Sequence, residues 1–89
     1  MTVSKHRVIV EEFQFLDELS ELEPDVIRAD EFIEGAKFVL SRNPEYGEHI
    51  GKNVWFLPMW KADEGRSAVL YYTFDTERVF FLSIQLDTG

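Results

Sequence analysis

Residues 68–86, which read AVLYYTFDTERVFFLSIQL, decide the predicted fold. Two runs dense in β-branched and aromatic residues flank the polar segment 75–77. Such runs favour strands, and a short polar connection between them is typical of a β-hairpin. Successive residues of a strand point to opposite faces of a sheet, so the adjacent rings of Tyr71 and Tyr72 must do the same. The sequence therefore predicts a hairpin with aromatic rings on both faces.

Further elements are predicted upstream of this hairpin. Apolar residues recur at steps of three and four from Val26 to Leu40, which indicates one face of a helix. Asp25 is placed to cap this helix, and Asn43-Pro44 ends it. Pro24 separates it from a shorter helix, and alternating residues at the start of the chain indicate a strand. The expected elements are a strand over 6–15, helices over 15–22 and 26–42, a loop over 43–53, and strands over 53–60, 68–75 and 78–86.

This order of elements predicts an α+β fold. Two helices would pack on one face of a mostly antiparallel four-stranded sheet, in the order strand, helix, helix, strand, strand, strand. A chain of 89 residues has room for one small core, so we expect a single domain over residues 1–89.

The negative charge is concentrated in one segment. The chain holds 17 acidic residues against 9 Lys and Arg, a formal net charge of −8. Residues 11–34 hold ten acids and one base, a net −9, whereas the rest holds seven acids and eight bases, a net +1. Nucleic acids and anionic membranes are polyanions that bind through Lys and Arg. Direct nucleic-acid binding is therefore disfavoured on the helical segment.

Several kinds of site lack the residues that they need. The absence of cysteine excludes disulfides, thiolate metal sites and thiol nucleophiles. The two histidines, His6 and His49, share no motif with metal-ligand spacing, so we expect neither a metal nor a cofactor. There is no apolar run of about 18 residues that could span a membrane. We predict a soluble, cytoplasmic protein with no membrane partner.

Three segments of the chain follow one another in a recognisable order. They are FVLSRNPEYG at residues 38–47, VWFLP at residues 54–58, and the hairpin with VLYYTFD at residues 69–75 and RVFFLSI at residues 78–84. A helix that ends in such an Asn-Pro-Glu-x-Gly segment, a Val-Trp strand and an aromatic hairpin occur in this order in the RelE/ParE superfamily. The chain resembles this superfamily of small bacterial toxins from type II toxin-antitoxin systems.

The resemblance implies a function as well as a fold. A toxin of this superfamily is held by a cognate antitoxin protein that wraps its helices and sheet. ParE-like members act on DNA gyrase, whereas RelE-like members are ribosome-dependent mRNA endonucleases whose Lys and Arg residues hold the RNA phosphates. A further alternative is a toxin fold that survives as a non-toxic interaction module.

This sequence departs from the nuclease pattern. Ala68 stands where the family often has Arg, only Arg66 lies nearby, and residues 85–89 replace the usual basic tail with QLDTG. Phosphodiester cleavage needs positive charge where negative charge develops. We therefore expect the protein to act through protein binding, to an antitoxin and to a target such as gyrase, with the ribosome-dependent endonuclease as the alternative.

The candidate site residues follow from these two hypotheses. For catalysis the remaining candidates are the cations Lys52, Lys61, Arg66 and Arg78. For partner binding, acidic helix positions would attract Lys and Arg of a partner segment, and exposed aromatic rings would add contact area. The ordinary alternative for the acidic positions is a solvated helix face. The predicted contact residues are Glu18, Glu21, Glu31, Glu34, Trp60 and Tyr72.

Overall fold

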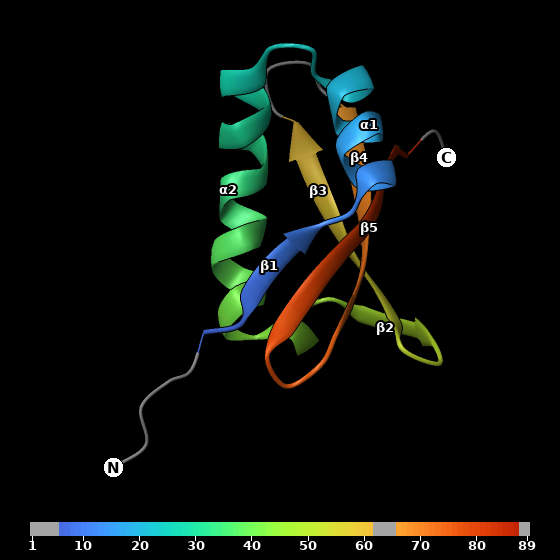
Figure 1. Cartoon of the computed structure of the whole chain (residues 1–89). Coiled ribbons are helices and arrows are strands. Elements are labelled where there is room, and N and C mark those ends of the chain that lie inside the picture. The colour runs from blue at the N-terminus through green and yellow to red at the C-terminus, as the bar shows by residue number, and fades with distance from the viewer. Residues whose placement is uncertain (1–5, 62–65, 88–89) are drawn as a thin grey trace.

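Two α-helices lie against one twisted sheet in the computed structural model, which describes residues 6–61 and 66–87 (Figure 1). The sheet has five described strands, and a short 3₁₀ helix follows the second α-helix. In chain order the elements are β1 (Val8–Glu11), α1 (Phe13–Leu22), α2 (Val26–Arg42), η1 (Pro44–Tyr46), β2 (Glu48–Gly51), β3 (Val54–Lys61), β4 (Arg66–Phe74) and β5 (Arg78–Leu86).

The start of α2 is built as the sequence predicts. The Asp25 carboxylate accepts hydrogen bonds from the backbone N–H groups of Ile27 and Arg28, at 3.0 and 3.1 Å. These are two of the donors that a helix start leaves without a partner. Arg42 lies in the last turn, where its charge favours the helix dipole. The prediction of a capped helix from residue 26 is confirmed.

The first strand is shorter than predicted. The expected strand over 6–15 is wrong in its second half, because the strand ends at Glu11 and α1 begins at Phe13. The N–H of Glu12 still bonds to the carbonyl of Phe81, and its carbonyl already accepts from the N–H of Leu16. Glu12 is therefore the residue at which sheet bonding gives way to helix bonding.

The sheet is mixed and has one strand more than predicted. Its order is β1-β5-β4-β3-β2, with β1 parallel to β5 and the other neighbours antiparallel. The expectation of four strands is wrong because β2 forms within the predicted loop. Its sequence, EHIG, has little strand propensity, but a turn with positive φ at Gly51 and Lys52 folds it back onto β3. Pairing across the turn, rather than composition, makes this edge strand.

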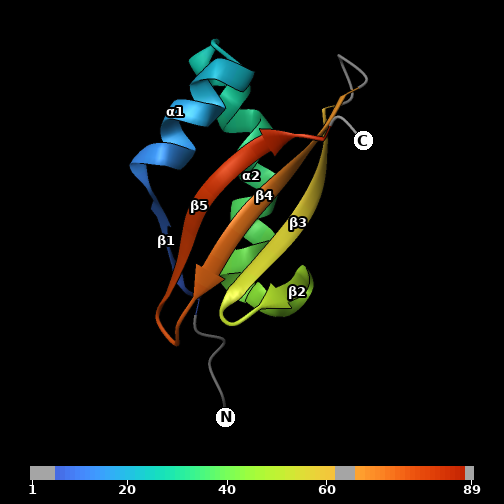
Figure 2. The ribbon, with the colours of Figure 1, turned by 90° about the vertical axis from the view of Figure 1, so that its right-hand side faces the viewer.

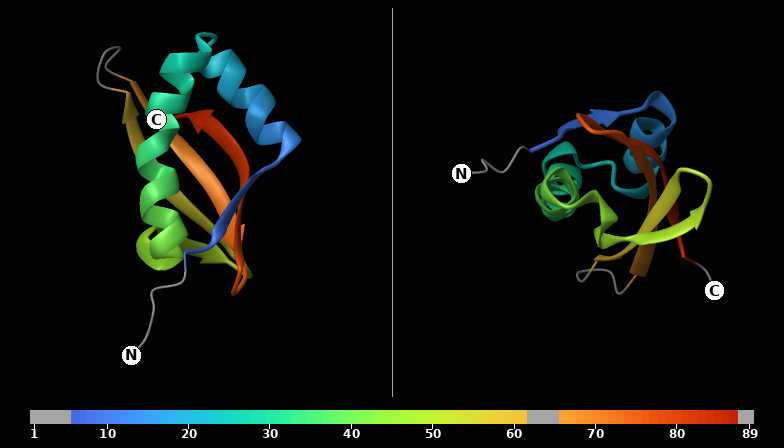
Figure 3. Two further views of the ribbon diagram at one scale, coloured as in Figure 1. Left: turned by 60° about the vertical axis from the view of Figure 1, so that its left-hand side comes forward. Right: turned by 90° about the horizontal axis from the view of Figure 1, so that it is seen from below.

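Both helices cover the same face of the sheet, as predicted (Figure 3). Phe15 of α1 packs edge-to-face on Phe81 of β5, with ring centroids 5.3 Å apart. The buried core draws on both helices and on the two central strands. Its members are Phe15, Leu19, Ala29, Ile33, Ala36, Leu40, Ala68, Leu70, Tyr72, Val79, Phe81 and Ile84.

No described helix covers the other face of the sheet, which Figure 2 presents to the viewer with α2 behind. Its side chains alternate with the buried ones and pair across β1, β5, β4 and β3. They are mostly half-buried, and Val8 is 63% exposed. We define the open sheet face by Val8, Val10, Phe56, Val69, Tyr71, Thr73 and Phe80.

The Tyr72 hydroxyl ties the loop after α2 to the core. It donates to the carbonyl of Pro44 and accepts from the N–H of Gly47, at 3.1 Å. Gly47 has no room for a side chain, since a Cβ there would overlap the Phe56 carbonyl oxygen and the Tyr72 hydroxyl. Burial raises the pKa of Tyr72, so this hydroxyl stays protonated and keeps its donor. The contact fixes where β2 begins.

Candidate protein-binding surfaces

A groove of about 170 Å³ separates the C-terminal part of α1 from the N-terminal part of α2. Leu16 and Val26 stand on its two sides, 41% and 73% exposed. Pro24 lies in the short link between the two helices and lines this groove. The interhelical groove is lined by Leu16, Leu19, Ser20, Glu23, Pro24, Val26, Ala29 and Asp30.

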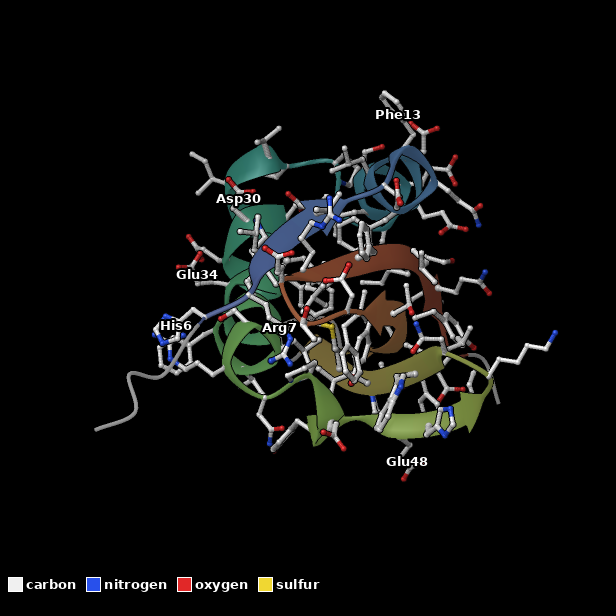
Figure 4. The ribbon with its side chains drawn as sticks, turned by 60° about the horizontal axis from the view of Figure 1, so that its bottom comes forward. His6, Arg7, Phe13, Asp30, Glu34 and Glu48 are labelled. Atoms are coloured by element: carbon white, nitrogen blue, oxygen red, sulfur yellow. The ribbon has the colours of Figure 1, made fainter. Side chains whose placement is uncertain are left out.

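An exposed aromatic ring extends the apolar surface of this groove. Phe13 lies one helical turn before Leu16 and is 88% exposed, the largest exposure among the large apolar side chains described. Figure 4 shows its ring projecting from the start of α1 into solvent. Exposed Phe and Leu one turn apart form a continuous apolar strip, which leads along α1 into the groove.

Carboxylates stand on the α2 side of the groove. Asp30 lines it, and Glu34 follows one turn later on the same helix (Figure 4). Glu23 lines it from the end of α1 and pairs with Arg28, with 3.6 Å between Arg28 Nε and Glu23 Oε1. The groove thus combines an apolar floor and wall with a mostly negative rim.

A second groove, of about 350 Å³, lies between α1 and the end of β5. β1 pairs with β5 only as far as Phe81, so the edge of β5 beyond this residue faces α1. One Glu18 carboxylate oxygen accepts from the Ser83 hydroxyl at 2.6 Å and from the Ile84 N–H at 3.1 Å. The carboxylate takes the place of a neighbouring strand and covers an edge that could otherwise pair with another chain.

The four predicted acidic contact residues do not form one surface. Glu18 is half-buried, and its carboxylate is bonded to the edge of β5. Glu21 is exposed beside the same edge, whereas Glu31 and Glu34 are exposed on α2. Glu34 is the one that continues the rim of the interhelical groove.

The two predicted aromatic contact residues differ in outcome. The expectation that Tyr72 is exposed is wrong, because its ring is fully buried under the helices and its hydroxyl is bonded within the fold. The adjacent Tyr71 takes the outward position instead. Trp60 lies near the end of β3, opposite Ser67 of β4, and its side chain falls outside the described part of the structure.

The four candidate catalytic cations lie at two ends of the sheet. Lys61 and Arg66 are paired directly across β3 and β4, and their side chains are outside the described part. Lys52, in the turn before β3, and Arg78, at the start of β5, lie at the opposite end. Eight residues of strand separate these ends by roughly 26 Å. Arg78 is also paired with Asp75, at 3.7 Å. One phosphate group therefore cannot contact all four cations.

The histidines and acids of the described residues form no cluster that could hold a metal ion. His6 is exposed ahead of β1 (Figure 4), whereas His49 stacks on Trp55 with centroids 4.9 Å apart and bonds to the Lys52 carbonyl. Within the same described part, no helix is both long and apolar enough to cross a membrane.

Comparison with known proteins finds no matching family model, no matching curated protein and no matching solved structure. The resemblance to the RelE/ParE superfamily stays a prediction from the sequence.

Sequence reasoning missed the apolar side of the interhelical groove. The predicted strand over 6–15 contains Phe13, Leu16 lies in the predicted helix over 15–22, and Val26 begins the apolar face of the second predicted helix. The signal that could have found them is stripe width: Phe13, Leu16 and Leu19 span more of α1 than a single buried face needs.

Proposed function

We propose that this protein works by binding another protein, as the toxin-like component of a bacterial type II toxin-antitoxin system. In this proposal the interhelical groove receives the antitoxin. The observation that carries it is the exposed apolar strip of Phe13, Leu16 and Val26 beside that groove. Contiguous exposed apolar side chains with a polar rim are typical of protein-binding surfaces.

The groove suits a peptide segment better than a free small molecule. Pockets for drug-sized ligands measure about 300–1,000 Å³, whereas this groove measures about 170 Å³. Such a volume accommodates one or two anchoring side chains of a longer segment, as when an amphipathic helix lies in a groove. Asp30 and Glu34 on the rim favour Lys and Arg on either side of the apolar anchors.

A bacterial growth assay tests this proposal. Inducing the chain alone should slow growth, and co-expression with the protein encoded by the neighbouring reading frame should restore it. Val26→Glu places a charge in the apolar wall, so this variant should escape rescue and lose binding to the neighbouring protein at least tenfold. Binding is measured by titration of the purified proteins.

Ile27→Glu is the matched control. Ile27 is 70% exposed, close to the 73% of Val26, and follows it in the first turn of α2, but it does not line the groove. Both substitutions add the same charge near the helix N-terminus, where it is favourable. Rescue of Ile27→Glu but not of Val26→Glu supports the groove. Equal rescue of both variants contradicts it.

The cellular readout separates the alternatives. Changed plasmid supercoiling supports gyrase as the target. Codon-linked cuts at transcript ends instead support the ribosome-dependent endonuclease, which the separated cations disfavour. Unchanged growth together with binding that Val26→Glu abolishes supports a non-toxic interaction module. Unchanged growth and no binding of the neighbouring protein contradict the proposal altogether.

A further inference from the structure

The open sheet face is a second apolar surface. A partner bound in the interhelical groove would leave it uncovered. Phe56, Tyr71 and Phe80 are half-buried there and come from β3, β4 and β5, which Figure 2 shows side by side. Rings from three adjacent strands form a patch rather than scattered exposure. We propose that two copies of the chain associate through their open sheet faces. This proposal is independent of the partner in the interhelical groove.

The charge on this face is small and balanced. Among the described strand residues that point to this side, the charged ones are Arg78 on β5 and Glu48 on β2, which is paired with Phe56 of β3. The two strands lie on opposite sides of β4 in the sheet order. Figure 4 shows Glu48 projecting away from the body of the molecule. Two copies of such a face meet without a net repulsion.

The distribution of the remaining charge selects this face over the helical one. Residues 11–34, with a net charge of −9, include α1 and the first part of α2, which cover the other side of the sheet. Contact through the helices would bring two such segments together. Contact through the open sheet faces puts them on the two outer sides of the dimer, where repulsion is least.

The repulsion between the helix layers of two copies depends on the distance between them. Stacked sheets lie about 10 Å apart and a helix has a diameter of about 10 Å, so the helix layers of the dimer would be roughly 30 Å apart. The Debye length is about 8 Å at physiological ionic strength, so charges at that separation are almost fully screened. A foreign basic partner, in contrast, is attracted to the helical side. Contact through the open sheet faces therefore joins two copies without bringing their acidic segments together.

The area of the open sheet face is small for a protein interface. β1 has four residues, and β3, β4 and β5 have eight or nine each. At about 3.3 Å per residue and about 4.8 Å between strands, they cover roughly 480 Å² per copy. Two copies together bury on the order of 1,000 Å², which is the lower limit for a specific interface. We expect a weak two-fold dimer with a dissociation constant in the micromolar range.

Cysteine trapping provides the test, since the chain has no cysteine of its own. β4 is the middle strand of the sheet, so a two-fold axis between two open faces passes near it. A single Val69→Cys substitution should then form a disulfide-linked dimer under mild oxidation. Val69→Cys removes little side-chain volume, so it preserves the fold. Ser20→Cys, in the interhelical groove, is the matched control and should stay monomeric.

Sedimentation of the full chain across a concentration series gives the second measurement. The unmodified chain and Phe13→Glu should dimerise equally, whereas Phe80→Glu should weaken dimerisation at least tenfold. A monomer at all concentrations overturns the proposal, as does trapping of Ser20→Cys in preference to Val69→Cys. Binding of single-stranded RNA to the monomer, lost in Phe80→Glu, also overturns it and assigns this face to nucleic acid.

Discussion

The two faces of the sheet carry the same residue types in opposite environments. Tyr71 and Tyr72 are neighbours on β4, and Phe80 and Phe81 are neighbours on β5. Tyr72 and Phe81 are fully buried under the helices, whereas Tyr71 and Phe80 are half-buried on the open sheet face. Residue type therefore does not determine whether one of these rings lies in the core or on an exposed surface. Strand alternation and the position of the helices determine which rings are buried and which lie on the open sheet face.

The largest difference in stability is expected when one ring is removed from each face of the sheet. Phe81 contacts Phe15 of α1 and is fully buried, so Phe81→Ala leaves a cavity and should lower the free energy of unfolding by about 3–5 kcal/mol. Phe80→Ala, the matched control, should cost roughly 1 kcal/mol in the monomer, because solvent already reaches its ring. Urea unfolding at a low protein concentration measures both.

Equal losses for these two variants would mean that the open sheet face is covered as well. A loss for Phe80→Ala that appears only at high protein concentration would mean that the stability of the chain depends on association through this face.

A smaller test removes one hydroxyl from each tyrosine. Tyr72→Phe loses the bonds to the Pro44 carbonyl and the Gly47 N–H, so it should lower the free energy of unfolding by about 1–3 kcal/mol. Tyr71→Phe changes the same atom on the open sheet face and should lie within about 0.5 kcal/mol of the unmodified chain. Thermal unfolding of the paired variants makes the measurement.

Hydrogen exchange locates the effect of the Tyr72→Phe variant. The amide of Gly47 should exchange faster there, whereas amides in the middle of α2 should keep their protection. Uniformly faster exchange throughout the chain would mean that the hydroxyl stabilises the whole core rather than the start of β2.

Most of the fold could be predicted from the sequence because local patterns determine it. The period of three and four in α2, the Asp25 cap and the aromatic hairpin are each specified by residues close together in the chain. β2 could not be predicted in this way, because the segment EHIG becomes a strand only through pairing with β3. The same holds for Glu12, whose N–H bonds to Phe81 across the sheet.

The candidate surfaces were harder to predict than the elements. The sequence indicates that large rings lie on both faces of the sheet. It does not indicate that Tyr72 lies on the buried face, because strand alternation does not say which of two neighbouring residues the helices cover. The sequence also gives no sign that the carboxylate of Glu18, a predicted contact residue, bonds to Ile84 of β5, which is 66 positions away in the chain. Such long-range bonds leave no trace in composition or periodicity.

The smallest expected change in stability concerns the turn over residues 75–77, which joins β4 to β5. The register that this turn sets determines which ring of each neighbouring pair faces the helices. A shift of one residue in the β4–β5 register would move Tyr72 and Phe81 to the open sheet face. Asp75 holds this turn, since one carboxylate oxygen accepts from the N–H groups of Glu77 and Arg78, at 2.8 and 2.7 Å. These two bonds, more than the nearby Arg78 charge, lower the pKa of Asp75 below its ordinary value.

A lowered pKa in the folded state means that the ionised carboxylate stabilises the fold. This contribution is complete above the unfolded-state pKa of about 3.9 and is lost as the pH falls through the lower pKa of the folded state.

Asp75→Asn keeps an acceptor oxygen but has no charge to lose, so it should be slightly less stable near neutral pH and should approach the unmodified chain in acid. Glu77→Gln is the control, because the backbone of Glu77, not its side chain, takes part in the turn. Urea midpoints measured from neutral pH into acid give the readout. A gap between Asp75→Asn and the unmodified chain that stays constant into acid would show that turn geometry, not ionisation, sets the register.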